Sequence, residues 1–161
     1  MIDASTDLRL YAFCNFYINS IGQGIQTAHV VGRMAKFYRK RNSDAANLFW
    51  QWLEEGCNNE TIIVCNGGMG ADISESYNKH ENTLTKLGIP SQIFYEEPRA
   101  FGTKEPTPTC WACVLPEEVY GARAYPDDLG NQRFYNGNVF YNNTHQLFDF
   151  LAYKNGCGLA R

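Results

Sequence analysis

Short runs of apolar residues recur along the chain, and glycine, proline or polar turn residues bound each of them. The runs cover residues 8–17, 61–65, 91–95 and 109–115. They are rich in aromatic and β-branched residues and are shorter than an ordinary helix, which favours buried β-strands. We therefore predict a buried strand at each run.

Helical periodicity fills most of the sequence between these strands. Apolar residues recur every three to four positions over residues 23–39, which predicts a first helix there. A second helix is predicted to start after Ser43, a suitable N-cap, and to end at Gly56. A third is predicted over residues 72–88, and Pro90 confirms that it stops there.

The remainder of the chain is rich in Tyr, Asn and Gly, and its pattern is harder to interpret. We expect a hairpin near residues 133–141 and a short helix over 144–153. Alternating strands and helices predict an α/β fold with a single mixed β-sheet of about four to six strands, flanked by helices on its faces. One domain, residues 1–161, is expected, with the core sheet and helices in 8–116 and an aromatic tail in 117–161.

Composition and charge narrow the class of protein. Hydrophobic residues make up 44% of the chain and charged residues 19%, which is typical of a folded globular domain. The formal net charge of −3 argues against long nucleic acid as a partner, because phosphate neutralisation requires a basic surface. No apolar run approaches the roughly 20 residues of a membrane helix, so no membrane partner is expected. Without a secretory signal, the six cysteines are expected to be reduced thiols in the cytoplasm.

The strongest candidate for a ligand site is the turn that follows the 61–65 strand. It contains Asn66, Gly67, Gly68 and Gly70, and a helix follows it directly. Ligands bind open sheets of this kind beyond the carboxyl ends of their strands. Exposed backbone amides at a helix N-terminus attract anions, and glycine permits close approach of a phosphate. The alternative is a tight turn whose glycines only supply positive φ angles.

The first turn and helix offer a second polar surface at the same end of the sheet. Gln23 and Gln26 have amide groups that suit hydrogen bonds to a base or ribose. The imidazole of His29 could also form a hydrogen bond to a base or ribose, although its position in the sequence favours a partly buried core histidine. This surface meets the glycine turn only if the first strand runs parallel to the 61–65 strand.

A third group of candidates lies in and beyond the polar loop after the 91–95 strand. Arginine suits bidentate binding of phosphate, although a lone arginine at a strand end is often an ion-pair partner. A cationic and aromatic lid over a ligand would consist of Arg99, Phe101, Lys104 and Arg123.

No arrangement of residues indicates covalent catalysis, a metal or a cofactor. Cys110 and Cys113 have the CxxC spacing, but they lie in a predicted strand, where residues three apart face opposite sides. A redox pair instead needs its first cysteine at a helix N-terminus. There is no second CxxC to complete a zinc site. We therefore expect no catalytic residues, no metal and no cofactor.

Residues 8–116 resemble the type 2 peptidyl-tRNA hydrolase fold. The likeness rests on GIQTAH at the first helix, LGIP at residues 87–90 and the IFYEEPR that follows. That family has a lysine before the first helix, where this chain has Gly22 or Gln23. It also has an aspartate where this chain has Glu96 and a threonine where it has Ala100. The resemblance implies an alternative function, a peptidyl-tRNA-hydrolase-like enzyme acting on tRNA or a small nucleotide.

A second resemblance covers nearly the whole chain. YAFCNFYINSIGQGIQTAHVV, the tryptophan-containing helix and TIIVCNGG are similar to the first-described phage Thoeris anti-defence sponge family. The resemblance implies a viral protein that sequesters a cyclic ADP-ribose isomer made by a bacterial immune protein, without cleaving it. Some members also bind cyclic oligonucleotides. It further implies a homo-oligomer built from dimers, with ligand bound at the contacts between subunits, in the cytoplasm of an infected host.

Overall fold

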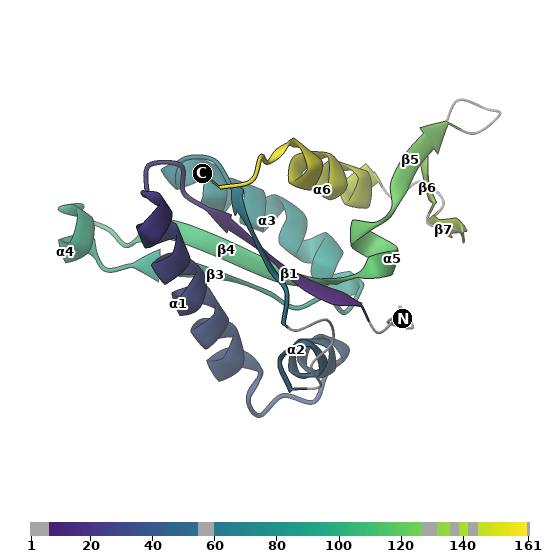
Figure 1. The fold of residues 1–161 in the computed structure, drawn as a ribbon, viewed down its shortest axis with the longest axis horizontal. Helices are drawn as coiled ribbons and strands as arrows, with labels where there is room; N and C mark the ends of the chain where they lie inside the picture. The colour runs from purple at the N-terminus through teal and green to yellow at the C-terminus, as the bar shows by residue number, and fades with distance from the viewer. Residues whose placement is uncertain (1–6, 55–59, 127–131, 136–138, 142–144, 161) are drawn as a thin grey trace.

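The core of the protein is a mixed four-stranded sheet in the order β2-β1-β4-β3 (Figure 1). β1 (Leu8–Cys14) is parallel to β2 (Ile62–Asn66) and antiparallel to β4 (Thr107–Pro116), and β4 is also antiparallel to β3 (Ser91–Glu96). The predicted α/β fold with one mixed sheet is confirmed. The computed structural model describes residues 7–54, 60–126, 132–135, 139–141 and 145–160.

This strand order brings the carboxyl ends of β1, β2 and β3 to one edge of the sheet. Because β4 is antiparallel to both β1 and β3, those two strands point the same way as β2. The carboxyl edge is defined here by the last residues of these strands, which are Cys14, Asn66 and Glu96. The parallel pairing of the first and second strands therefore places the two predicted polar surfaces at the same edge.

Helices cover both faces of the sheet. Figure 1 shows α1 (Ser20–Tyr38) and α2 (Asp44–Glu54) on one side, with α3 (Gly70–Lys86) and α6 (His145–Gly156) on the other. Buried residues form one hydrophobic cluster on each face. Alternate residues of a strand point to opposite faces. As predicted, Cys110 belongs to the cluster beneath α1 and α2, and Cys113 belongs to the cluster beneath α3 and α6.

Local signals explain where several elements begin and end. β1 stops at Cys14, three residues before the predicted end, because the chain then turns into α1. Asn19 caps α1, and its Oδ1 accepts a hydrogen bond of 2.7 Å from the amide of Gly22. Ser43 caps α2 as predicted, since its Oγ accepts from the amide of Ala46 at 3.1 Å. The predicted end of that helix at Gly56 lies outside the described residues.

The rest of the chain adds short elements. α4 (Pro98–Phe101) follows β3, and α5 (Glu117–Tyr120) follows β4. A separate antiparallel sheet in the order β5-β6-β7 consists of β5 (Arg123–Pro126), β6 (Gln132–Tyr135) and β7 (Val139–Tyr141). The predicted hairpin corresponds to β6 and β7, and the predicted C-terminal helix corresponds to α6.

The last described residues pair with the outer edge of β2. Leu159 forms an antiparallel bridge with Cys65. The amide of Asn66 donates to the carbonyl of Gly158 at 2.8 Å, and the amide of Ala160 donates to the carbonyl of Val64 at 3.0 Å. We call residues 158–160 the C-terminal segment. Within the part of the chain that the structure describes, no helix has the length and apolarity to cross a membrane.

Candidate ligand-binding site

A cavity of about 530 Å³, named here the edge cavity, lies at the carboxyl edge of the sheet. The turn after β1, the start of α3, α4 and the start of β4 form its walls. Its lining is mainly apolar and aromatic, with a few hydroxyl and amide groups. The lining residues are Asn15, Tyr17, Ile18, Met69, Gly70, Asp72, Phe101, Thr107 and Thr109.

A second cavity of about 520 Å³, named here the tail cavity, lies beside the first. It shares Tyr17 and Ile18 with the edge cavity. The C-terminal segment forms one of its walls, and the turn between β1 and α1 forms another. Its lining residues are Phe16, Tyr17, Ile18, Asn19, Gln23, Asn66, Gly158, Leu159 and Ala160. Together the two cavities form a divided hollow around Tyr17 and Ile18.

The amides of the glycine turn are not available for an anion. The amide of Asn66 donates to Gly158, and the amide of Gly67 donates to the carbonyl of Cys14 at 2.8 Å. The amide of Gly68 donates to Oδ1 of Asn66 at 3.2 Å. The expectation that these three amides cradle a phosphate is therefore wrong, because the protein's own acceptors already satisfy them.

Gly67 is a glycine for reasons of packing. A Cβ at this position would lie 2.7 Å from Cβ of Phe13 and 2.8 Å from its carbonyl carbon. Its neighbours fit the alternative interpretation, in which glycine supplies positive φ: Gly68 has a φ of 100° and Gly70 a φ of 30°. The turn thus lets β2 pass close to β1 before α3 begins.

The start of α3 is the part of this turn that faces a cavity. Gly70 is the first residue of α3 and lines the edge cavity. The N-cap Met69 supplies no side-chain hydrogen bond, although its carbonyl accepts from the amide of Asp72 at 2.7 Å. A Cβ built at Gly70 would meet no atom within 4 Å. The N-terminus of α3, which has a partial positive charge, therefore borders the edge cavity.

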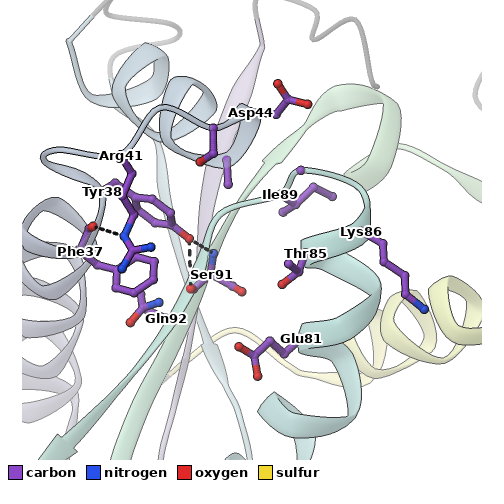
Figure 2. A pocket seen from close by; sticks show the side chains of 13 residues that line it. Phe37, Tyr38, Arg41, Asp44, Glu81, Thr85, Lys86, Ile89, Ser91 and Gln92 are labelled. Carbon is purple, nitrogen blue, oxygen red and sulfur yellow. Dashed lines mark hydrogen bonds between the residues drawn. The ribbon is translucent and has the colours of Figure 1, made fainter.

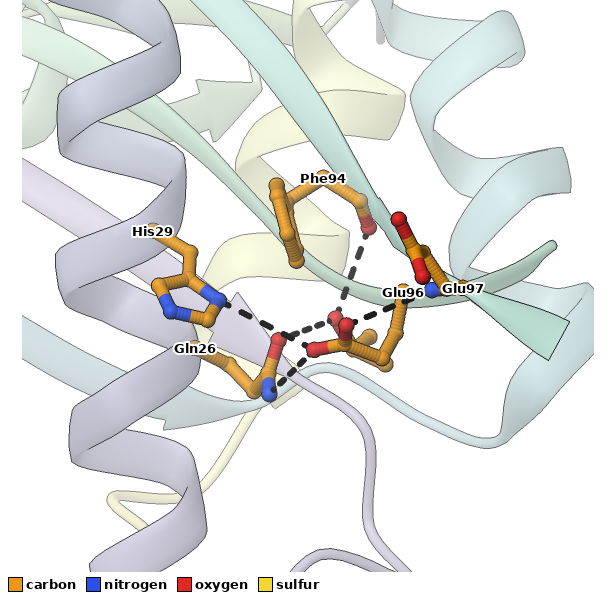
Figure 3. A network of polar contacts seen from close by, with 6 residues as sticks. Gln26, His29, Phe94, Glu96 and Glu97 are labelled. Carbon is orange, nitrogen blue, oxygen red and sulfur yellow. Dashed lines mark hydrogen bonds and ion pairs between the residues drawn. The ribbon is translucent and has the colours of Figure 1, made fainter. Parts of the chain in front are cut away.

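Gln26 belongs to a polar network at the end of β3 (Figure 3). Its Nε2 donates to Oε2 of Glu96 at 3.1 Å, and its Oε1 accepts from Oγ1 of Thr109 at 2.7 Å. Both ends of the buried amide are therefore bonded within the protein. Gln26 is 7% exposed and lines neither cavity, so the predicted contact with a ligand is not formed there. Thr109 connects this network to the edge cavity, which it also lines.

His29 joins the same network from the surface. Its Nδ1 lies 3.8 Å from Oε2 of Glu96, and its ring centroid lies 4.8 Å from that of Phe94. The side chain is 44% exposed. The interpretation as a partly buried core histidine is wrong, because α1 turns this position toward solvent. Glu96 itself is half-buried and is the acceptor that holds the network together.

Gln23 has a different environment from Gln26, although both lie on α1. Its Nε2 donates to the carbonyl of Ile18 at 2.7 Å. Its Oε1 is buried and accepts no hydrogen bond from any described residue. Gln23 lines the tail cavity and is only 6% exposed. Gln23 is thus a predicted site residue whose Oε1 is available to accept a hydrogen bond.

Among the predicted lid residues whose side chains the structure describes, Phe101 alone lines one of these two cavities. Phe101, at the end of α4, lines the edge cavity. Arg99 and Lys104 are exposed and do not line either cavity. Arg123 begins β5, and its side chain lies outside the described residues. The described lining of both cavities contains Asp72 and no Lys or Arg, so a strongly cationic pocket is not formed by these residues.

A further cavity of about 460 Å³ lies at the opposite end of β3, between α1, α2 and α3 (Figure 2). There the hydroxyl of Tyr38 accepts from the amide of Ser91 at 3.0 Å and donates to the carbonyl of Ser91 at 3.3 Å. The guanidinium of Arg41 lies 3.9 Å from the centre of the Phe37 ring. None of the predicted ligand residues lies here, so the candidate site remains at the carboxyl edge.

Sequence reasoning missed Tyr17 and Ile18, which line both cavities, and Thr109, which lines the edge cavity. Tyr17 ends the run predicted as a strand, Ile18 follows it directly, and Thr109 lies at the predicted start of another strand. Their position in the sequence could have identified them, because all three residues lie next to the carboxyl edge of the sheet, and the strand directions that define this edge could be inferred. Neither the protein-family models nor the curated proteins contain a match to this chain.

Proposed function

We propose that this protein binds a small cyclic nucleotide at the carboxyl edge and holds it without cleaving it. A cyclic ADP-ribose isomer is the ligand proposed, with cyclic oligonucleotides as further candidates. The biological role that follows is removal of an immune signal in an infected bacterium. The observation that carries the proposal is the edge cavity, which opens on the uncapped start of α3 between aromatic walls.

The size and lining of the hollow support a nucleotide-sized ligand. Each cavity has a volume of roughly 500 Å³, within the range of small-molecule sites. Tyr17, which lines both cavities, supplies a ring that can stack on a base, and Phe101 supplies an apolar wall of the edge cavity. The start of α3 at Gly70 favours one phosphate, and the carboxylate of Asp72 suits the hydroxyls of a ribose, which donate hydrogen bonds. Because Asp72 would contact ribose hydroxyls and not the phosphate, its negative charge is compatible with an anionic ligand.

The groups that line the cavities suit binding better than cleavage. Among the described lining residues there is no Cys, His, Lys, Arg, Ser or Glu. The hydroxyl of Thr109 is committed to Gln26 as a donor. Nucleophilic catalysis needs a nucleophile hydrogen-bonded to a base. Among the described lining residues, Asp72 is the one carboxylate, and the hydroxyls of Thr107 and Thr109 bond to Thr103 and Gln26 instead of to it. A ligand held here would therefore remain intact.

The test is recovery of the ligand after binding. Purified protein is titrated with a cyclic ADP-ribose isomer by calorimetry, then denatured by heat, and the released nucleotide is identified by mass spectrometry. We expect saturable binding and an intact ligand. Phe101→Ala is expected to weaken binding about tenfold because the ligand loses an apolar wall of the edge cavity, whereas Phe37→Ala, at the other end of the sheet, leaves it unchanged. The two rings are comparably exposed, at 48% and 39%. A cleaved nucleotide would contradict the proposal.

The network around Glu96 favours a second candidate function, a hydrolase acting on tRNA or a small nucleotide. A half-buried carboxylate held by Gln26, with His29 beside it, is an arrangement suited to general acid–base chemistry. Thr109 links it to the edge cavity. This function predicts turnover of peptidyl-tRNA that disappears in Glu96→Ala. Absence of turnover by the unmodified protein would exclude it.

We further propose that the protein is a homo-oligomer that associates through α1. The outward face of this helix presents Ile21, Gly24, Ile25, Ala28 and Gly32, all of them exposed. A Cβ at Gly24 or Gly32 would meet nothing within 4 Å, so no described segment covers them. Small residues flanked by isoleucines let a second helix approach closely. Light scattering is expected to give a dimer or larger species, and Gly24→Glu is expected to give a monomer.

A further inference from the structure

The two amide side chains of the tail cavity have fixed orientations. The carbonyl of Ile18 only accepts hydrogen bonds, so the atom of Gln23 that faces it is Nε2. The amide of Gly68 only donates, so the atom of Asn66 that faces it is Oδ1. The groups left over are therefore Oε1 of Gln23, an acceptor, and Nδ2 of Asn66, a donor.

These two groups have no partner within the described part of the chain. Oε1 of Gln23 is buried and unsatisfied, and Nδ2 of Asn66 donates to no described residue. Both side chains line the same cavity. Buried polar atoms in proteins are nearly always hydrogen-bonded, so an orphaned acceptor beside a cavity indicates a missing donor.

The unused acceptor of Gln23 and the unused donor of Asn66 together favour one part of a nucleotide over the others. A phosphate offers acceptors only, and it would leave Oε1 of Gln23 unsatisfied. A nucleobase edge offers a donor next to an acceptor, which are the two kinds of partner that Oε1 of Gln23 and Nδ2 of Asn66 require. Phe16 and Tyr17 are exposed aromatic residues in the same lining and supply a surface for stacking. The tail cavity is therefore suited to a base, while the start of α3 in the edge cavity is suited to a phosphate.

We infer that the tail cavity is the base-binding half of the site and reads the amino edge of adenine. The 6-amino group donates to Oε1 of Gln23, and N1 accepts from Nδ2 of Asn66. The ribose and phosphate groups continue past Tyr17 and Ile18 into the edge cavity. This inference rests on the proposed function. It adds that the base binds in the tail cavity and that the ribose and phosphate groups bind in the edge cavity.

The experiment compares two ligands that differ only in the base. A cyclic ADP-ribose isomer and its hypoxanthine analogue have the same linkage, but position 6 changes from donor to acceptor and N1 from acceptor to donor. We expect the unmodified protein to bind the hypoxanthine compound at least tenfold more weakly. Asn66→Asp keeps the acceptor for Gly68 and removes the donor. It is expected to bind the adenine compound at least tenfold more weakly and to discriminate less between the two ligands.

Two controls separate this inference from other effects. Asn47→Asp adds the same charge on the exposed surface of α2 and is expected to bind both compounds like the unmodified protein. Melting temperatures of the variants verify that each is folded. Equal affinity of the unmodified protein for the two ligands would overturn the base assignment and leave the proposed function standing. Failure to bind either ligand would overturn both.

Discussion

His80 provides a direct test of how packing sets a proton affinity in this protein. It lies on α3 against α6, with its ring 5.5 Å from that of Phe150 and 5.3 Å from that of Tyr153. The residue is 2% exposed, and its Nδ1 has no hydrogen-bond partner among the described residues. Burial, with a smaller effect from Lys79, lowers the pKa of His80 from 6.5 to about 4.

Because the pKa of His80 differs between the folded and unfolded chain, the free energy of unfolding depends on pH. Between pH 6.5 and pH 4 the unfolded chain binds a proton at His80 and the folded chain does not, so acid favours unfolding. The contribution is fully present above pH 6.5 and is lost as the pH falls toward 4. The difference between the two pKa values corresponds to roughly 3 kcal/mol of unfolding free energy.

The assay is urea unfolding followed by tryptophan fluorescence at pH 7 and pH 4.5. His80→Phe keeps an aromatic ring in the α3–α6 contact and removes the titrating group. Carboxylates contribute equally to both proteins, so the unmodified chain is expected to lose about 2 to 3 kcal/mol more than the variant over this interval. Between pH 7 and pH 8 histidine is neutral in both states, and the two proteins must then behave alike. Identical losses at pH 4.5 would refute the assignment of a depressed pKa to His80.

Three further predictions concern stability and access. Gly67→Ala forces a Cβ to within 2.7 Å of Phe13, so urea unfolding is expected to show a loss of about 2 kcal/mol or more. Gly156→Ala, at the exposed end of α6 where a Cβ meets no atom within 4 Å, is the matched control and is expected to gain up to about 1 kcal/mol. Tyr38→Phe removes the hydroxyl that bonds both backbone groups of Ser91 and is expected to cost about 1 to 3 kcal/mol in the same assay, while an unchanged stability would show that water replaces it. Deleting residues 158–161 uncovers Cys65, whose pKa burial raises to about 11, and its labelling by a thiol reagent is expected to accelerate at least tenfold.

The fold was largely predictable because local signals agreed with the tertiary structure. Strand runs such as 61–65 are β-branched and bounded by glycine, and they remain strands once packed. Ser43 is an N-cap by side-chain chemistry alone. Errors arose where the chain reverses: Phe16 and Tyr17 continue the aromatic run of the strand before them, and the pairings with β2 and β4 show that β1 ends at Cys14.

The candidate site was less predictable, because its properties come from contacts between distant residues. A glycine that supplies φ and a glycine that avoids a neighbouring strand look alike in sequence, and Gly67 is of the second kind. Gln23 and Gln26 are chemically identical, yet Glu96 and Thr109 occupy one amide and leave the acceptor of the other unused. These differences depend on residues 70 or more positions away along the chain.

The C-terminal segment also bears on how copies of this protein can associate. An unpaired outer strand is a template on which further chains can add, and uncontrolled addition leads to fibrils. Here Gly158 and Ala160 already occupy backbone groups of Asn66 and Val64, so β2 cannot recruit a neighbouring molecule without first releasing its own terminus. Growth by continuation of the sheet past β2 is therefore blocked, whereas β3 forms the opposite edge of the four-stranded sheet.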